Sequence, residues 1–220
     1  MDFKNGAELL DLCSQYSCSI SQIMRRRECE LGETTQDVLQ AKMERILSIM
    51  KESATSPIKS PRKSIGGLIG GEARLLNEHR TAGKAICGNV ISRAITYACA
   101  VLEVNTSMGL IVAAPTAGSS GIVPGVILAL QEEYRISDDR LMDALFNAGA
   151  IGYLAMRNAT VAGAVGGCQA EVGVAAAMAA SAAVELMGGS PESCLDAAST
   201  VLMNMLGLVC DPVGGLVEYP

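Results

Sequence analysis

The sequence is poor in aromatic side chains: tryptophan is absent, and there are only 2 phenylalanines and 5 tyrosines. Half of the 220 residues are nevertheless hydrophobic, and 23 are glycine and 11 methionine. A chain of this length can bury a full core. That core must be built from small and flexible side chains, and helices that carry such side chains can approach one another closely.

Long basic runs and membrane-length apolar runs are also missing. The formal net charge is −6, and the basic residues cluster only at residues 25–27 and 62–63, which argues against a nucleic-acid-binding surface. The longest stretch without a charge, residues 104–131, contains polar residues and two prolines. It is therefore not expected to span a membrane.

The 8 cysteines show no paired spacing, and no signal peptide precedes them. In a chain with a core of normal size, this pattern does not indicate a disulfide framework. We expect a reducing, cytoplasmic setting in which most thiols are ordinary buried residues and only one or two have a special role.

Helical patterns fill most of the chain, and the predicted fold class is all-α, with a helical domain built around closely packed Gly/Ala-rich helices. The first helical pattern runs from residue 1 to about 53. Within it, Thr34 or Thr35 could cap a helix whose apolar face repeats with a period of 3.6 residues. Ser137 and Ser190 mark two further helix starts. The remaining helical patterns cover residues 72–103, 121–134, 137–156, 169–187 and 191–209.

Residues 53–64 contain two Ser-Pro steps and precede two Gly-Gly pairs. Because a residue before proline favours extended backbone, this segment is the best candidate for a linker. We therefore predict an N-terminal helical arm with a Ser/Pro linker over residues 1–65, followed by a main helical domain over residues 66–220.

Two cysteines far apart in sequence are predicted to be neighbours. Cys168 opens one helix, a Gly-rich turn follows, and a helix of nearly equal length leads to Cys210. Each helix spans roughly 27 to 30 Å, so an antiparallel hairpin returns Cys210 to the end where Cys168 lies. A helix N-terminus also favours a thiolate and an anionic ligand such as an iron-sulfur cluster. By itself such a pair is more often packing, and Cys194, at the opposite end, is interpreted as structural.

Four segments carry a specific resemblance. They are EVNTSMG at residues 103–109, IVAAPTAGSSG at 111–121, GCQAEVG at 167–173 and GLVCDPVGGLVE at 207–218. Together they resemble the iron-sulfur-dependent L-serine dehydratases, over at least residues 66–220, and the chain is similar to the alpha subunit of such an enzyme.

The resemblance implies a 4Fe-4S cluster held by three cysteines, with a fourth iron open to substrate. Cys168 and Cys210 match the first two ligands, and the third would follow directly after Pro220. We therefore expect the main domain to be truncated at its C-terminus and the chain as given not to hold an intact cluster. The resemblance also implies a hetero-oligomer, because a smaller beta subunit supplies a Ser-His-Thr motif that this sequence lacks.

The implied reaction is the dehydration of L-serine to aminoacrylate, which then yields pyruvate and ammonia, with the open iron as the Lewis acid. The general base stays unassigned and could come from the partner chain, because His79, the only histidine, lies on a polar helix face. The Gly-rich loop before Pro124 offers N–H groups for a carboxylate, although by itself it could be a plain turn. The resemblance places substrate at Asn105, Ser107, Thr116, Ala117, Gly118, Ser119, Ser120 and Gly121.

Two other functions are alternatives to this one. A pyridoxal-phosphate dehydratase would perform the same reaction, but Lys84 lacks the expected setting and the βα alternation of those enzymes is absent. A non-catalytic helical scaffold or regulatory subunit fits the helix propensities equally well. The Gly-flanked loops at residues 118–121 and 166–168 argue against it, because simple packing does not require them.

Overall fold

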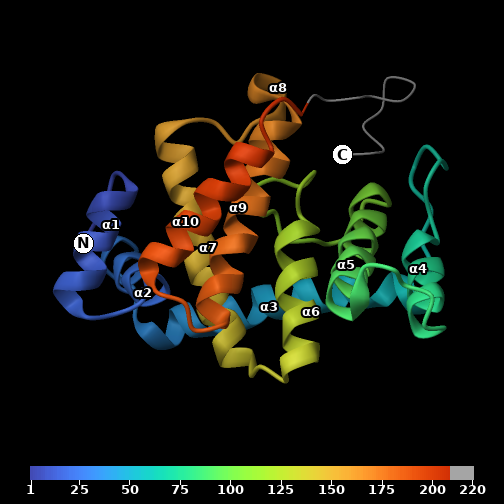
Figure 1. The fold of residues 1–220 in the computed structure, drawn as a ribbon, viewed down its shortest axis with the longest axis horizontal. Helices are drawn as coiled ribbons and strands as arrows, with labels where there is room; N and C mark the ends of the chain where they lie inside the picture. Colours follow the sequence, from blue (N-terminus) through green and yellow to red (C-terminus); the bar gives the residue numbers. More distant parts are fainter. Residues whose placement is uncertain (209–220) are drawn as a thin grey trace.

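The chain is helical throughout the part that its computed structural model describes, which is residues 1–208 (Figure 1). This part contains no strand, so the predicted all-α fold class is confirmed. In chain order the helices are α1 (Gly6–Tyr16), α2 (Ile20–Leu31), α3 (Gln36–Lys59), α4 (Glu72–Thr81), α5 (Gly88–Thr106), α6 (Ile122–Tyr134), α7 (Asp138–Asn158), α8 (Gly163–Gly166), α9 (Cys168–Leu186) and α10 (Pro191–Asn204).

Local capping divides the first helical stretch into three helices. The side chain of Asn5 accepts a hydrogen bond from the Glu8 N–H at the start of α1, and Ser19 forms a capping box at the start of α2. Thr35, one of the two residues predicted to cap, accepts from the N–H of Val38 at the start of α3. These side chains satisfy N–H groups that have no partner inside the helix.

The linker predicted at residues 53–64 is wrong in its first half. Its first Ser-Pro step lies inside α3, where Pro57 is buried, and the helix ends only at Lys59. Proline removes one helical hydrogen bond, but α3 buries Met50 and Ala54 on the same side as Pro57. Burial of that apolar face offsets the lost hydrogen bond, so only the second Ser-Pro step, at Ser60, coincides with the end of the helix.

Two other predicted boundaries also shift. The pattern over residues 72–103 is two helices, because the chain turns at residues 82–87, where Gly83 has a φ of 70°. The last helix, predicted to reach residue 209, ends at Asn204, and Val209 lies outside the described residues. Ser190 caps α10 as predicted, whereas the side chain of Ser137 makes no capping hydrogen bond to α7.

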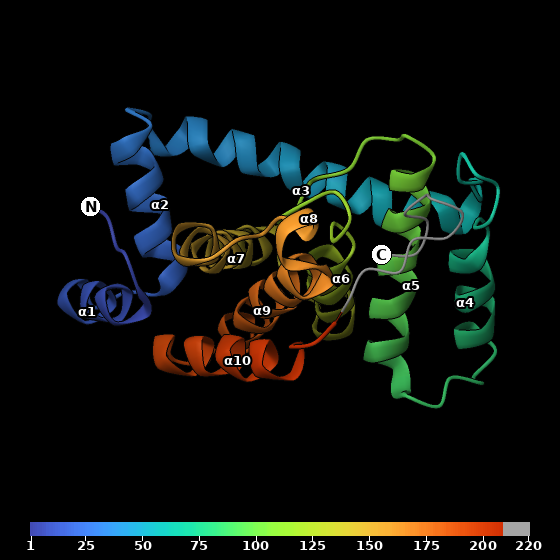
Figure 2. The same ribbon diagram turned by 90° about the horizontal axis from the view of Figure 1, so that it is seen from above.

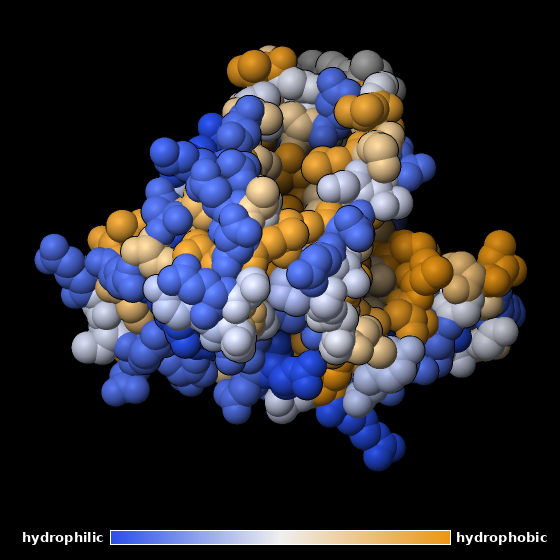
Figure 3. Space-filling view, turned by 60° about the vertical axis from the view of Figure 1, so that its left-hand side comes forward, coloured by the Kyte–Doolittle hydropathy of each residue, from blue (hydrophilic) through white to orange (hydrophobic). Residues whose placement is uncertain are grey.

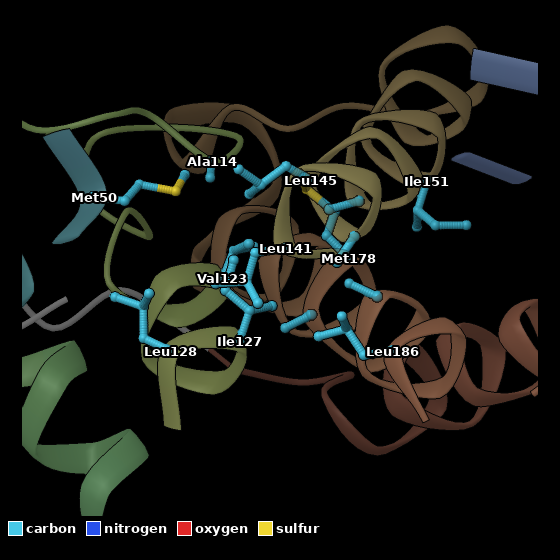
Figure 4. Close-up of a cluster of buried hydrophobic side chains, with 14 of the residues drawn as sticks. Met50, Ala114, Val123, Ile127, Leu128, Leu141, Leu145, Ile151, Met178 and Leu186 are labelled. Carbon is cyan, nitrogen blue, oxygen red and sulfur yellow. The ribbon is translucent and has the colours of Figure 1, made fainter. Parts of the chain in front are cut away.

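The main core surrounds α9, an alanine-rich helix that packs against α6, α7 and α10 (Figures 1 and 2). In Figure 4, Val123 and Ile127 of α6 lie beside Leu141 of α7, and Leu145 lies close to Met178 of α9. A helix without charged residues over most of its length is buried on several sides, and this holds for α9 between residues 172 and 184. The position of α9 therefore determines where Cys168 lies at its first residue and where the turn to α10 lies at its other end.

A second core cluster joins the N-terminal helices to the rest of the molecule. Phe3, Leu9 and Ile23 are fully buried there together with Phe146 of α7 and Cys194 of α10. The long helix α3 then runs from the α2 end of the molecule to the α4 end (Figure 2). The N-terminal segment therefore shares core contacts with α7 and α10, while the proposed boundary between residues 65 and 66 stays a prediction.

Several large apolar side chains remain on the surface, and the face shown in Figure 3 has apolar areas beside hydrophilic ones. Ile86 is fully exposed, and Met108, Val165 and Leu206 are also mostly exposed. Within the described residues, no helix combines the length and apolarity needed to cross a membrane.

Glycine brings α5 and α6 into close contact. A Cβ atom added to Gly121 would lie 2.6 Å from the carbonyl oxygen of Ala98, and one added to Gly125 would lie 2.8 Å from that of Ala94. Both neighbours are backbone atoms of α5, which cannot rotate away as a side chain could. The closely packed Gly/Ala-rich helices expected from composition are therefore present at this contact.

Replacing Gly125 by alanine is expected to lower the free energy of unfolding by about 1–3 kcal/mol, because the added methyl group forces α5 and α6 apart. Guanidinium denaturation followed by circular dichroism would measure the change. Gly149→Ala is the matched control, since a Cβ there would meet only the Met24 Cε atom, at 3.9 Å, and alanine is the better helix former. Equal unfolding midpoints for the two variants would contradict the prediction.

Candidate functional site

The loop predicted to bind substrate connects α5 to α6 and is tied to the end of α5. The side-chain amide of Asn105 donates a hydrogen bond to the carbonyl oxygen of Ala117, with a distance of 3.0 Å. The peptide bond between Ala114 and Pro115 is cis. Asn105 therefore positions the loop through its amide nitrogen.

The hydroxyl groups that were predicted to contact substrate mostly form hydrogen bonds within the loop. Ser120 donates to the carbonyl oxygen of Ala117 at 2.7 Å, and the Oγ atoms of Thr116 and Ser119 lie 3.1 Å apart. Ser119 and Ser120 are buried, and Ser107 donates to the carbonyl oxygen of Val104 at the end of α5. These hydroxyls stabilise the loop conformation, and their contact with substrate stays a prediction.

The backbone at Ala117 and Gly118 is one accessible part of the loop. Ala117 is exposed and Gly118 half-buried, and within the described residues the N–H groups of these two residues make no hydrogen bond. Gly121 begins α6 and is buried against α5. Two adjacent N–H donors at the surface of a rigid loop suit a small anionic group such as a carboxylate.

Cys168 is the first residue of α9, as predicted, and it is half-buried. The preceding residue, Gly167, has a φ of 74°, a left-handed conformation that glycine adopts without a steric penalty. The short helix α8 leads directly into this turn. The thiol is thereby placed at the positive end of the helix dipole, which favours an anionic ligand there.

The hairpin that should return Cys210 to Cys168 is confirmed as far as residue 208. α10 packs along α9, and after it the backbone N–H of Gly207 donates to the side-chain oxygen of Gln169 at 2.9 Å. The carbonyl oxygen of Leu208 lies 3.3 Å from an ideal Cβ position on Gly167. Cys210 lies outside the described residues, two positions beyond this contact.

Glu171 belongs to the same site, although its motif alone gave it no role. Its carboxylate oxygens lie 3.6 Å from the Cβ position of Gly118, and a Cβ on Gly163 of α8 would overlap its Oε2 atom. The side chain thus joins the first turn of α9 to the loop predicted to bind substrate and to α8. Its place within the motif at residues 167–173 was the available signal, but the contact with a loop about 50 positions earlier depends on the tertiary fold.

The buried cysteines differ from Cys168 in their chemistry. Cys194 is buried beside Cys13 in the second core cluster, as expected of a structural residue. Burial raises the pKa of Cys13 to about 12 and that of Cys194 to about 11, with Glu185 adding to both shifts. These thiols are neutral at physiological pH and poorly suited to hold a metal.

The folded protein is expected to lose stability as the pH rises above about 9. Below the ordinary thiol pKa of 9.0 both states of the chain are protonated, so the contribution of Cys13 is fully present; it is lost as the pH rises toward about 12. Urea denaturation at pH 8 and pH 10 would measure this loss, and Cys13→Ala should reduce it. An equal loss in the variant would show that other groups are responsible.

No group of three or more metal-binding side chains occurs among residues 1–208. His79 is exposed on α4, as predicted for a bystander. The described part therefore contains one of the predicted cluster ligands, Cys168, placed at a helix N-terminus. The protein is therefore all-helical in its described part. Its loop, thiol and carboxylate form a candidate site for a small polar substrate.

Comparison with known proteins identifies the family. A family model described as "Serine dehydratase alpha chain" matches residues 15–220. A "Probable L-serine dehydratase, alpha chain" from Bacillus subtilis (strain 168) is 42% identical over 218 residues, which cover 99% of this chain and 72% of the relative. An "L-serine dehydratase, alpha chain" from Peptoniphilus asaccharolyticus is 40% identical over 213 residues, covering 97% of this chain and 73% of the relative.

The chain belongs to the serine dehydratase alpha-chain family, and the resemblance read from the four motifs is confirmed. The predicted enzyme class, an L-serine ammonia-lyase, agrees with the names of these relatives. "L-serine dehydratase TdcG" from Escherichia coli (strain K12) is 35% identical over 231 residues, but the match covers only 49% of that protein. Relatives in this family therefore include proteins about twice as long as the matched region.

Proposed function

We propose that the chain is the cluster-carrying alpha subunit of an iron-sulfur L-serine dehydratase, which converts L-serine to aminoacrylate and hence to pyruvate and ammonia. The observation that carries the proposal is the meeting of three features at one end of α9. Cys168, the returning end of α10 and the loop at residues 116–121 are brought together there, the loop through Glu171. The names of the relatives supply the substrate.

The residues present fit an iron-sulfur cluster as far as they are described. Cys168 would be the first ligand and Cys210 the second, with a third expected from the residue after Pro220. The thiol of Cys168 begins a helix, and the chain toward Cys210 returns to Gly167 and Gln169, which suits a negatively charged group. Such a group would supply a Lewis acid for the departing hydroxyl, which is a poor leaving group at neutral pH.

The chain's own residues would bind and orient the substrate. The N–H groups of Ala117 and Gly118 are available for its carboxylate, and the amide of Asn105 keeps the loop in place. The hydroxyls of Ser119 and Ser120 hold the loop rigid from within. A preorganised loop keeps the substrate oriented without further ordering of the chain during the reaction.

The proposed partner of the enzyme is a smaller beta subunit, which could also supply the general base. The names of the relatives as alpha chains support a multi-subunit enzyme. The only histidine of this chain, His79, lies on α4, and no described contact joins it to the loop or to α9. A base from the partner chain is therefore the simplest proposal.

The test is anaerobic reconstitution of the alpha chain, with its native C-terminus, together with the smaller subunit, iron and sulfide. The expected result is pyruvate from L-serine and a broad absorption near 400 nm, a value typical of iron-sulfur proteins, that oxygen bleaches. A distinct aldimine band with activity in the absence of iron would replace the proposal by a pyridoxal-phosphate enzyme. If the reconstituted protein showed neither activity nor absorption, the result would favour a non-catalytic scaffold.

A further inference from the structure

Glu171 has an acidic side chain that lies beside two glycines, and their lack of side chains leaves room for it. It lies in the first turn of α9, three positions after Cys168. Gly118 and Gly163 both face its carboxylate, and the space that a side chain would take at Gly163 is filled by Oε2. The two glycines thus allow one carboxylate to reach the substrate-binding loop from a different helix.

The carboxylate has no partner of its own within the described residues. Among residues 1–208, the side chain of Glu171 takes part in no hydrogen bond or ion pair, and the residue is half-buried. Partial removal of a charged group from water is costly unless another group compensates it. An arriving cation would therefore be bound favourably at this position.

The loop and the carboxylate together match the two ends of an amino acid. The N–H donors of Ala117 and Gly118 suit an anionic group, whereas the oxygens of Glu171 can only accept hydrogen bonds when ionised. An α-ammonium group offers three donors, and a hydrogen bond between two charged groups is the strongest kind available. The distance of 3.6 Å from Glu171 to the Gly118 Cβ position brings these two complementary groups into one site.

We propose that Glu171 binds the α-ammonium group of the substrate and thereby restricts the enzyme to amino acids. The inference rests on the proposed function, because it names the residue that recognises one end of the same substrate. A hydroxy acid that lacks the amino group would offer no cation to the carboxylate of Glu171 and should bind more weakly. Glu171 is thus a specificity-determining binding residue, and it carries no step of the elimination.

The test compares two ligands that differ by the ammonium group, L-alanine and propionate, neither of which has a hydroxyl to eliminate. Calorimetry on the reconstituted holoenzyme would give both affinities, and inhibition of L-serine turnover would confirm them. With Glu171→Gln, L-alanine should bind roughly 10- to 100-fold more weakly, as expected when a charged hydrogen bond is lost. Propionate binding should hold or improve, and the KM for L-serine should rise more than kcat falls.

Glu192→Gln is the matched control, because Glu192 is an exposed carboxylate in the first turn of α10, at the other end of the hairpin. It removes the same charge from a helix start and should leave both affinities unchanged. Glu171→Asp, which keeps the charge, should recover part of the L-alanine binding, and thermal unfolding would confirm that each variant is folded.

Two outcomes would overturn the inference. An equal change in L-alanine and propionate affinity would mean that Glu171 only shapes the site, and a lower kcat at constant KM would assign it to the reaction itself. A wild-type holoenzyme that binds L-alanine but forms no pyruvate would refute the proposed function, while the ratio of the two affinities would still decide the role of Glu171.

Discussion

Alanine at Cys168 is expected to reduce pyruvate formation by the reconstituted enzyme to below about 1% of the wild-type rate. Loss of a supporting residue around a metal site already costs about 10- to 100-fold, and Cys168 is proposed to be a direct ligand. The substitution removes the thiol from the N-terminus of α9 while leaving a helix-favouring residue in its place. Cys210→Ala should have the same effect.

Cys29→Ala is the matched control for the cysteine variants. Cys29 is half-buried like Cys168, but it lies on α2 in the N-terminal part of the molecule. Iron content, absorption near 400 nm and the rate with L-serine should all fall together in the Cys168 variant and hold in the control. A Cys168 variant that loses iron but keeps its rate would refute the assignment of the cluster to the reaction.

The overall hairpin around Cys168 could be predicted from sequence because it depends on local features. Glycines mark the turn before α10, and Ser190 and Pro191 mark its start, whereas its end at Asn204 falls earlier than predicted. These are short-range signals that tertiary contacts did not overrule. The contact of Gly207 with Gln169 forms although α10 has 14 residues and α9 has 19, because residues 205–207 continue past the end of α10 to the start of α9.

The helix end wrongly predicted near Pro57 has the opposite cause, because here tertiary contacts overrule the local signal. The rule that proline ends a helix describes an isolated chain, whereas α3 packs its buried face against several other helices. Burial of each large apolar side chain contributes about 1.5–3 kcal/mol, which is comparable with the cost of about 3 kcal/mol for proline in a helix. Which effect prevails depends on neighbours that sequence patterns do not reveal.

The candidate site shows the same limit. The motif at residues 111–121 indicated a binding loop, but the burial of Ser119 and Ser120 and the use of their hydroxyls within the loop come from the way α5 and α6 pack. Likewise, Glu171 meets Gly118 only because α9 lies next to the start of α6. Sequence motifs identified the segments of the site, and packing assigned the individual side chains.

Replacing Glu103 by leucine is expected to lower the free energy of unfolding by about 3–5 kcal/mol, although this residue begins one of the family-like motifs. Its side chain is 1% exposed, and its carboxylate accepts from the backbone N–H groups of Ala73 at 2.8 Å and Arg62 at 3.3 Å. The first turn of α4 has no side-chain cap of its own at Gly71. Glu103 therefore caps α4 from another helix, and each lost hydrogen bond to its charge would cost about 1.5–3 kcal/mol.

Glu103→Gln separates this capping role from packing. The amide oxygen of glutamine can still accept from one N–H group, but its nitrogen cannot accept from the other, so the loss of stability should be about half of that seen with leucine. Glu52→Leu, at an exposed position on α3, is the matched control and should change stability by less than about 0.5 kcal/mol. Urea denaturation of the three variants would provide the comparison. If Glu103→Leu were as stable as the control, the segment at residues 60–73 would not depend on this carboxylate, and the motif at residues 103–109 would have to be explained by the substrate instead.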